Sequence, residues 1–533
     1  MTTLVDVSPL LAAAAPDRKA PSPRRLWIDI AILGLALFLR LFLLAMKPAH
    51  FDEGVNGWFV DEMTKNGYYH YDPTNFHGPF HFYILFIAQT LLGRHIWALR
   101  LPLVLASTAS VWVVLSLRHW LGERTCQVAA MAMAVSPAMT FYGRYAIHES
   151  WMLLSLLLIF RGGLGLWRRG ERIDLWTLLA GVTGCILTKE TYAIHFAALL
   201  LAIPTLMALE LITGPGEPAV PQRWTRMDAA IGGVVGLWVI IFFYSGGFLD
   251  GSSLPGLWLT FREWFTTGTS GASGHEKLWH YWLEMMERYE LPTAVGLVAA
   301  VWVGLLERRR PLRLLAIWGC GVLTAFSIIR YKTPWCILSL MWPFLFLFAD
   351  GIARLARKVD PWVAGALGVA VLGHSIHNSY LLNFWNETDE NEPYVYVQTL
   401  PAIHHLLDPL NAIVARNPAS IHLSGKILFP TGDSHPLPWL LGDYTGVEFL
   451  EEKKAPKEMD ADFLLIADAF VSDVEDRLTE RYFRQPITLR GNSGDSSNLY
   501  FREATFGWYF DGRRPEFTPH AKAGEEGKMT NDK

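Results

Sequence analysis

Apolar stretches close to 20 residues long recur along the first 382 positions of the chain. A helix needs about 20 apolar residues to cross the hydrocarbon core of a bilayer, so this pattern predicts a polytopic α-helical membrane protein. His81–Gly93 is also apolar but too short to span, and we expect it to lie on the outer face of the membrane. We expect about 11 transmembrane helices, over 26–46, 98–117, 126–142, 151–167, 175–187, 193–212, 229–249, 291–306, 314–330, 335–353 and 361–382.

The connections between these stretches alternate in charge. Arg24-Arg25 places the N-terminus on the arginine-rich side, so 1–25 is expected to be a disordered cytoplasmic segment. The first outer loop, 47–97, and the C-terminal domain then lie outside the cytoplasm of an integral plasma-membrane or inner-membrane protein. By the positive-inside rule, the cytoplasmic connections are 118–124, 168–172, 222–226, 307–313 and 354–358.

After the last apolar stretch, the composition becomes that of a soluble domain. An amphipathic helix is expected over 394–416, interrupted by two prolines, and another helix over 474–482. Strands alternating with helices predict a small extracytoplasmic α/β domain over 383–505, and the polar segment 506–533 is expected to be a disordered tail. The strand-like runs are 420–423, 447–450, 463–467, 486–489 and 498–502.

The overall composition supports this assignment and excludes some partners. The chain is 51% hydrophobic and 18% charged, which is not the balance of an ordinary soluble protein. The net charge of −4 is near neutral and no basic domain stands out, which argues against a nucleic-acid partner. The four cysteines all fall in apolar stretches, so neither a disulfide framework nor a thiolate metal site is indicated.

Asp52 and Glu53 form an acidic pair where the first expected span leaves the membrane. Carboxylates at a membrane rim are costly to keep without a task. They could simply cap a helix over 55–65, because acidic side chains favour helix N-termini. The alternative is a general base beside a second carboxylate or a metal ligand, close to a lipid-borne substrate.

Further polar residues stand at the outward ends of later spans, and together they predict one charged pocket. His77 precedes a Gly-Pro turn and could bond a substrate or simply border that turn. The charged residues of this set, given next, could instead form local ion pairs or bind lipid headgroups. However, arginine and lysine on the outer face are natural ligands of a phosphate. The remaining pocket residues are Arg144, His148, Glu149, Lys189 and Glu190, and the phosphate-binding candidates are Arg330, Tyr331 and Lys332.

The order of these motifs resembles the C-type (GT-C) membrane glycosyltransferases, with the protein O-mannosyltransferases and the aminoarabinose transferases as the closest branches. The resemblance runs from Leu26 to about Glu503. Two further motifs, Tyr331-Lys-Thr-Pro-Trp335 and Pro436-Leu-Pro-Trp439, are similar to the flippase-activity-associated, mannosyltransferase-like subgroup. The motifs that carry the wider resemblance are the acidic pair, His77-Gly-Pro79, Leu99-Arg-Leu-Pro102, the outward loop 144–149 and Leu187-Thr-Lys-Glu190.

This resemblance implies a GT-C-like membrane domain over 26–382 that transfers a sugar from a polyprenyl-phosphate donor to an acceptor glycan, lipid or protein. By the same resemblance, Asp52 matches the essential acid of the first outer loop and Glu149 the acid of the second. The mannosyltransferases carry a His-Pro-Pro step where this chain has His77-Gly-Pro79.

The chemistry of the residues fits transfer with inversion. A phosphate leaving group needs cations, whereas the acceptor hydroxyl needs a base, for which Asp52 is the candidate. A divalent cation such as Mg²⁺ or Mn²⁺ on Asp52 and Glu149 stays open. The alternative function is a lipid-linked-sugar flippase or transporter component that uses the same charges without transferring the sugar.

Overall fold

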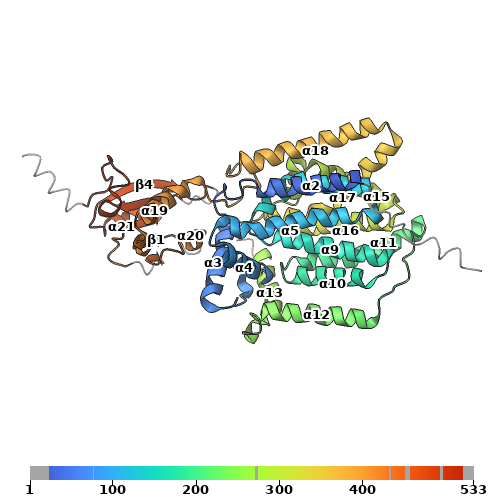
Figure 1. Cartoon of the computed structure of the whole chain (residues 1–533), viewed down its shortest axis with the longest axis horizontal. Coiled ribbons are helices and arrows are strands. Elements are labelled where there is room, and N and C mark those ends of the chain that lie inside the picture. The colour runs from blue at the N-terminus through green and yellow to red at the C-terminus, as the bar shows by residue number, and fades with distance from the viewer. Residues whose placement is uncertain are drawn as a thin grey trace, which may run out of the picture.

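The chain folds into a long helical bundle with a smaller α/β domain at one end (Figure 1). The computed structural model describes residues 23–75, 77–269, 274–430, 434–450, 456–491 and 496–519. The expected disordered N-terminus lies outside these residues up to position 22, as does the expected tail from position 520.

Each of the eleven apolar stretches forms a helix, and the third is a helix pair broken at Ser136-Pro137. Six helical stretches within the described residues are long and apolar enough to cross a membrane: Ile96–Leu121, Glu149–Arg168, Tyr192–Thr213, Arg226–Tyr244, Arg310–Ile328 and Pro334–Lys358. A total of eleven crossings stays a prediction. The helices are α2 (Pro23–Leu41), α5 (Ile96–Ser116), α7 (Glu123–Val135) with α8 (Pro137–Phe141), α9 (Glu149–Arg168), α10 (Arg172–Ile186), α11 (Tyr192–Thr213), α12 (Arg226–Tyr244), α15 (Leu291–Leu306), α16 (Arg310–Ile328), α17 (Ile337–Lys358) and α18 (Pro361–Phe384).

Helix α17 lies at the centre of the bundle and packs against α7, α9, α15, α16 and α18. Its first 13 residues, Ile337–Ala349, are all buried, as expected of a helix that is apolar on every face. Helices α11 and α12 are equally apolar but bury only 17% and 11% of their spans inside the protein. Their exposed apolar faces suit contact with lipid.

Shorter helices connect the long ones. Between the bundle and the α/β domain lie α3 (Phe51–Asn66) and α4 (Phe80–Leu92) (Figure 1). Leu85 of α4 packs with Leu99 and Leu103 of α5, so the apolar segment 81–93 covers the end of the bundle, consistent with an outer-face helix. The remaining short helices are η2 (Pro73–Asn75), α6 (Arg118–Leu121), η3 (Tyr142–Arg144), η4 (Gly251–Ser253), α13 (Gly256–Thr269), α14 (Tyr281–Tyr289) and η5 (Pro334–Cys336).

The C-terminal domain is built on a five-stranded sheet in the order β2-β1-β3-β5-β4. The first three strands in this order are parallel, and β5 and β4 complete the sheet in antiparallel fashion. Apolar side chains on both faces of the fully buried strand β3 pack against helices, as an α/β sheet requires. The elements are η6 (Pro401–Ile403), α19 (His404–Arg416), η7 (Pro418–His422), β1 (Gly425–Leu428), α20 (Leu437–Leu440), β2 (Val447–Leu450), β3 (Phe463–Ala467), η9 (Asp468–Phe470), α21 (Val471–Glu475), β4 (Tyr482–Thr488), β5 (Ser496–Arg502) and α22 (Glu503–Phe506).

Several boundaries in this domain differ from the sequence prediction. The helix expected over 394–416 begins only at Pro401, as η6 followed by α19, and residues 394–400 form an irregular linker. The expected first strand, 420–423, lies in η7 and the strand begins at Gly425, because Pro418 and the Asn417 side chain, which accepts from the Ala419 N–H, start a helical turn instead. The expected helix over 474–482 ends early at Glu475, and Tyr482 opens β4. Phe517 pairs with Tyr482 in a β-bridge, so the folded domain continues past residue 505.

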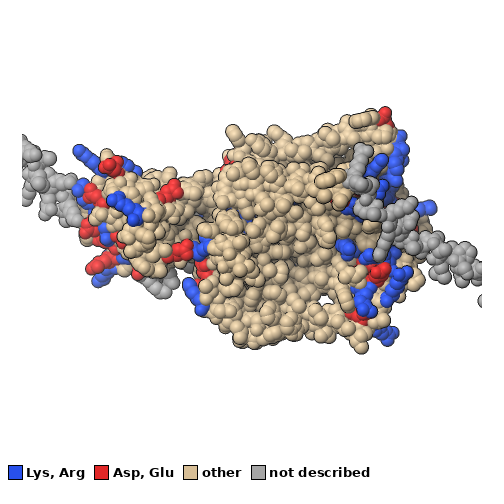
Figure 2. All heavy atoms as spheres, in the orientation of Figure 1, with Lys and Arg blue, Asp and Glu red and all other residues tan. Residues whose placement is uncertain are grey.

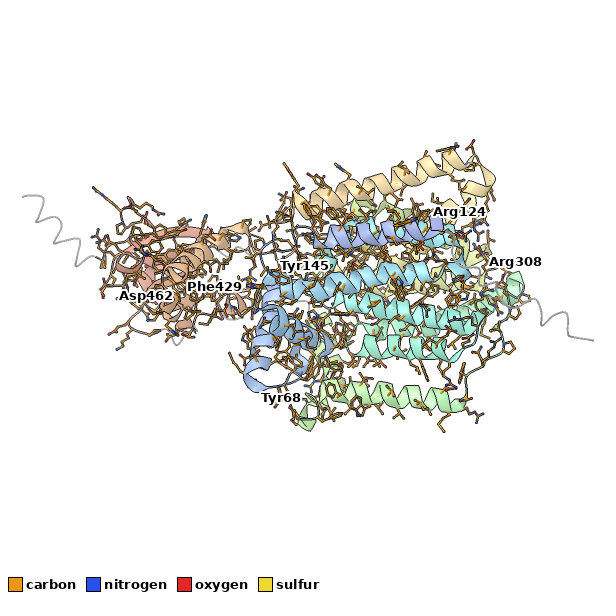
Figure 3. All side chains as sticks on the ribbon, viewed as in Figure 1. Tyr68, Arg124, Tyr145, Arg308, Phe429 and Asp462 are labelled. Carbon is orange, nitrogen blue, oxygen red and sulfur yellow. The ribbon has the colours of Figure 1, made fainter. Side chains whose placement is uncertain are left out.

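The two ends of the bundle differ in their charged side chains. Figure 2 shows lysine and arginine gathered at the end of the bundle that is remote from the α/β domain. Arg124 and Arg308, from two of the arginine-rich connections, lie at that remote end, whereas Tyr145 lies toward the α/β domain (Figure 3). The two sets of connections that the sequence distinguishes therefore lie at opposite ends of the molecule.

Candidate active site

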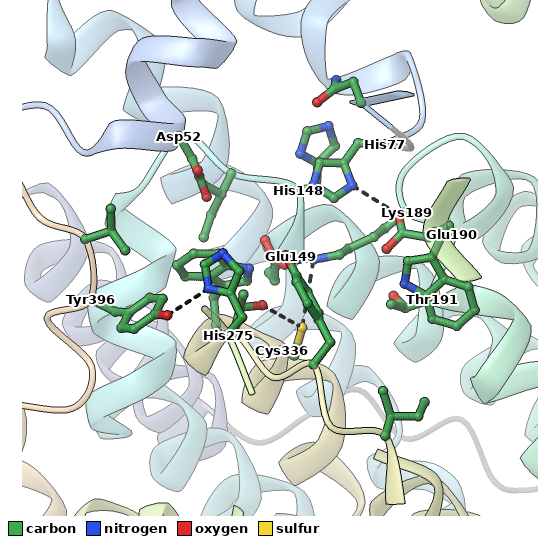
Figure 4. Close-up of a pocket in the computed structure, with 18 of the residues that line it drawn as sticks. Asp52, His77, His148, Glu149, Lys189, Glu190, Thr191, His275, Cys336 and Tyr396 are labelled. Atoms are coloured by element: carbon green, nitrogen blue, oxygen red, sulfur yellow. Dashed lines mark hydrogen bonds and ion pairs between the residues drawn. The ribbon is translucent and has the colours of Figure 1, made fainter. Parts of the chain in front are cut away.

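A cavity of about 1010 Å³ lies where the bundle meets the α/β domain. Its walls come from the start of α3, the connections before α9 and α11, the segment after α16 and the linker around Tyr396 (Figure 4). Of the candidate residues, the cavity is lined by Asp52, His77, His148, Glu149, Lys189, Glu190, Arg330 and Tyr331. The tertiary structure thus brings together eight of the eleven residues singled out from the sequence.

Asp52 stands in the first turn of α3 and borders the cavity. The helix starts at His50, whose Nδ1 accepts a hydrogen bond from the Asp52 backbone N–H at 3.0 Å. No hydrogen bond or ion pair to the Asp52 carboxylate occurs in the part of the chain that the structure describes. The carboxylate is therefore held at the cavity wall without being neutralised by a protein cation, which is what a general base requires.

Glu53, the other half of the acidic pair, points away from the cavity and is fully buried. Its two oxygens accept hydrogen bonds from Arg100 at 2.8 and 2.6 Å, and from the backbone N–H groups of Ala146 and His50. Burial alone would raise the pKa of Glu53, but Arg100 and these donors hold it below its usual value. Because every lone pair is engaged, Glu53 serves the structure of the first outer loop, and only Asp52 faces the cavity.

Two motifs that are far apart in the sequence join at the cavity wall. His77 and Lys189 form a β-bridge, and the Gly78 N–H donates to the Thr188 carbonyl at 3.0 Å. A Cβ on Gly78 would overlap the Leu187 backbone, so the glycine is needed for this close approach. The His-Gly-Pro step thereby holds His77 next to Glu190, with Nδ1 and the carboxylate 3.0 Å apart.

A buried charged cluster forms the wall around Glu149. The Lys189 ammonium ion-pairs with the Glu149 carboxylate and lies 3.9 Å from the Cys336 sulfur. Burial opposes the charge on Lys189, but the Cys336 sulfur together with the Glu149 and Glu190 carboxylates outweighs it and raises the pKa of the ammonium above its usual value. His148 is buried beside this cluster, and burial together with neighbouring histidines lowers its pKa well below the usual value. The cluster therefore places an ion-paired ammonium at the cavity wall beside a neutral imidazole.

The two outward cations after α16 take different positions. Arg330 and Tyr331 line the cavity, whereas the Lys332 ammonium is turned into its own loop. Lys332 donates to the backbone carbonyls of Ser327 at 3.1 Å, Lys277 at 3.3 Å and Ile329. Arg330 is thus placed to meet a phosphate, and Lys332 is placed to hold the loop.

Arg144 also lies outside the cavity lining. Its guanidinium donates to the carbonyls of Leu39, Phe42 and Leu43, where α2 ends. It thereby caps the end of the first long helix, whose last carbonyls have no partner within the helix.

Several residues of the wall were not singled out from the sequence, among them His275, Cys336, Tyr396 and Arg490. His275 Nδ1 and the Tyr396 hydroxyl are 2.7 Å apart, which links the loop after α13 to the linker of the α/β domain. Arg490 comes from the α/β domain itself. Only the packing of the C-terminal segments on the bundle places Tyr396 and Arg490 at the cavity, and no local sequence signal marks these two residues.

The residues do not form a ready metal site. No group of three or more His, Cys, Asp or Glu side chains with metal-binding geometry occurs among the described residues. Of the two carboxylates considered for a divalent cation, Glu149 is already paired with Lys189.

Comparisons with known proteins find similar sequences and similar folds. A family model described as dolichyl-phosphate-mannose-protein mannosyltransferase matches residues 76–241. The undecaprenyl phosphate-α-4-amino-4-deoxy-L-arabinose arabinosyl transferases of Pseudomonas paraeruginosa and Pseudomonas aeruginosa are each 24% identical over 302 residues. That match covers 55% of this chain and 52% of the relatives, so the chain spans about half the length of the curated relatives it matches.

Solved structures extend the likeness to the whole fold. The structure of ArnT from Cupriavidus metallidurans bound to undecaprenyl phosphate is 16% identical with a TM-score of 0.60, covering 90% of this chain and 98% of that chain. The oligosaccharyltransferase of Archaeoglobus fulgidus is 10% identical with a TM-score of 0.50, covering 86% and 72%. The fold of this chain is therefore that of ArnT, in agreement with the GT-C-like fold expected from the sequence. Its place in a particular subgroup stays a prediction.

Proposed function

We propose that this chain is a membrane glycosyltransferase that moves a sugar from a polyprenyl-phosphate donor to an acceptor hydroxyl. The carrying observation is the cavity, which is bordered by the unneutralised carboxylate of Asp52, by the guanidinium of Arg330 and by the ammonium of Lys189, which is paired with Glu149. This is the pair of opposite charges that the transfer needs, because a base must activate the acceptor while cations stabilise the departing phosphate. The Pseudomonas relatives, named as transferases with an undecaprenyl-phosphate sugar, support the donor class.

The proposed reaction is a single displacement. Asp52 takes the proton of the acceptor hydroxyl while the acceptor oxygen bonds to the anomeric carbon. The bond from that carbon to the phosphate oxygen breaks, and its electron pair leaves with the polyprenyl phosphate. Lys189 and Arg330 stabilise the negative charge on the leaving group. Attack opposite to the leaving group inverts the anomeric centre, through an oxocarbenium-like transition state.

The proposed orientation has the N-terminus and the arginine-rich connections in the cytoplasm. The gathering of lysine and arginine at the end of the bundle remote from the α/β domain supports it, because cytoplasmic loops carry an excess of these residues (Figure 2). The cavity and the α/β domain then face outward, and the acceptor is an extracytoplasmic glycan, lipid or protein. Protease protection of the C-terminal domain in sealed spheroplasts would contradict this orientation.

The test is transfer from labelled undecaprenyl-phosphate sugars in membranes that contain the chain, beside the Asp52→Asn variant. Mannose and aminoarabinose donors are the first to try, because the family model and the relatives name these sugars. We expect the native chain to form product, and Asp52→Asn to bind undecaprenyl phosphate while losing transfer by more than about 100-fold. Full transfer by Asp52→Asn would contradict the assignment of the base. Donor binding by the native chain without any transfer would favour the flippase or transporter function instead.

A further inference from the structure

We propose that the α/β domain is a positioning element for Asp52, and that Trp439 and Pro436 hold the helix that carries this residue. This inference rests on the proposed function, because it assigns the domain a role in that reaction. The contact is between α20, with the preceding Pro436, and one face of α3. Asp52 stands in the first turn of α3, so any movement of α3 moves the carboxylate.

Two glycines on α3 make the contact close. Gly54 and Gly57 are one turn apart on the same face of the helix, and both are buried. A Cβ on Gly57 would lie 2.5 Å from the Trp439 indole ring, and a Cβ on Gly54 would overlap the Pro436 backbone. Glycine is among the least favourable residues in a helix interior, so its presence at both positions is explained by the approach of the domain.

Polar contacts fix the position of Trp439. Its indole N–H donates to the Gln89 side chain of α4 at 3.2 Å. Arg94 donates to the Trp439 carbonyl and also pairs with Asp61 of α3 at 2.7 Å and with Asp443 of the domain at 3.4 Å. Trp439 is 3% exposed, so the contact is a packed interface and excludes water. The indole is therefore held against α3 from two sides.

The residues that flank Asp52 are held by C-terminal segments as well. The centre of the Phe51 ring is 5.5 Å from that of the His435 ring and 4.8 Å from the Arg490 guanidinium. His50, which caps α3, uses Nδ1 as an acceptor for Asp52, so its Nε2 carries the proton and donates to the Tyr396 carbonyl at 2.6 Å. The backbone on which Asp52 stands is therefore bonded to the domain and its linker, while the carboxylate itself stays at the cavity wall.

These contacts indicate that Trp439 and Pro436 help to position Asp52. Neither residue needs to contact the substrate for this. A base must lie within hydrogen-bond reach of the proton it takes, and small misplacements of a reacting group are costly. Loosening the contact should therefore lower kcat and leave donor binding unchanged, since Lys189 and Arg330 belong to other elements.

The experiment measures kcat and the binding of undecaprenyl phosphate in the purified full-length chain for Gly57→Ala, Trp439→Leu and the double variant. Gly57→Ala inserts a methyl group against the indole, and we expect kcat to fall about 10- to 100-fold with binding within about twofold of native. In the double variant the leucine leaves space for the methyl group, so its kcat should equal that of Trp439→Leu alone. Trp439→Leu adds no atoms and tests the same role if Gly57→Ala does not fold.

The matched control is Gly34→Ala in α2, where an added Cβ meets no atom within 4 Å, and we expect native kcat. Native kcat in folded Gly57→Ala and folded Trp439→Leu would overturn the positioning role while leaving the proposed transferase intact. An equal loss of kcat and donor binding would also overturn it, because the domain would then shape the whole cavity. Absence of transfer by the native chain would instead refute the proposed function, and this inference with it.

Discussion

The Arg100 guanidinium holds both carboxylate oxygens of Glu53, at 2.8 and 2.6 Å, in a pair that is almost completely buried. Arg100 stands in the first long helix after the outer loop, and Glu53 in the helix that carries Asp52. The remaining donors of Arg100 reach the carbonyls of Leu44, Lys47 and Pro48. One arginine thus ties the bundle to the start of the active-site helix.

Removal of Arg100 should destabilise the protein strongly. Arg100→Leu leaves the Glu53 carboxylate buried without its partner, and breaking a buried pair in this way costs about 3–5 kcal/mol. The free energy of unfolding of the purified protein, measured by denaturant titration, checks this. Arg262→Leu is the control, since its pair with Glu263 is exposed and should contribute less than about 1 kcal/mol. A loss below about 1 kcal/mol for Arg100→Leu would refute the structural role of this pair.

Lys189 should matter for transfer more than for donor binding. Lys189→Met removes the ammonium and leaves the Glu149 and Glu190 carboxylates beside the leaving phosphate. Loss of one electrostatic stabiliser of this kind costs about 10²–10³ in kcat. Steady-state transfer from a labelled undecaprenyl-phosphate sugar measures it, with the exposed Lys65→Met as the control. Unchanged kcat in Lys189→Met would show that this cation takes no part in stabilising the leaving group.

Arg330 and Lys332 should differ in their effects, although they are two residues apart. Arg330 borders the cavity, so Arg330→Ala should raise KM for the donor about tenfold or more. Lys332 donates to the backbone carbonyls of Lys277 and Ser327, so Lys332→Met should lower the thermal midpoint of unfolding and change KM little. Donor titrations and thermal unfolding on both variants decide the matter. The reverse pattern would show that Lys332 turns toward the donor.

Glu290 should make stability depend on pH near neutrality. It lies in the turn between α14 and α15, where its carboxylate accepts from the Ala138 N–H at 2.7 Å and from the Ser136 hydroxyl at 2.9 Å. Burial raises its pKa to about 8, against about 4.3 in an unfolded chain. Between these values the folded state binds more protons than the unfolded state, so the contribution of Glu290 to stability is greatest at low pH and falls as pH rises to about 8.

The measurement for Glu290 is the thermal midpoint of unfolding from pH 5 to pH 9. Glu290→Gln should flatten the decline toward pH 8 and be relatively more stable at high pH. Glu284→Gln, whose side chain is exposed on α14, should follow the native curve. An identical pH dependence in native protein and Glu290→Gln would refute the raised pKa.

The periodic apolar stretches predicted the helices of the bundle. A membrane-spanning segment must be apolar over its own length, so its own residues are enough to identify it. Each of the eleven expected stretches is helical, and the arginine-rich connections lie at one end. The strands 447–450 and 463–467 were also predicted with their observed bounds. The strand expected at 420–423 was wrong because helical capping by Asn417 and Pro418 competes with the strand-like composition.

The sequence by itself determined which polar residues stand at the outward ends of the helices. The position of such a residue relative to an apolar stretch can be read from its neighbours in the chain. Only the tertiary structure decided which of them share a cavity. Asp52 and Glu53 are neighbours in the chain, yet Arg100 takes one into the core and leaves the other at the cavity wall. Arg490 and Trp439 reach the site from more than 380 positions away, since packing of the C-terminal domain on α3 depends on shape and on two glycines that no periodic pattern marks.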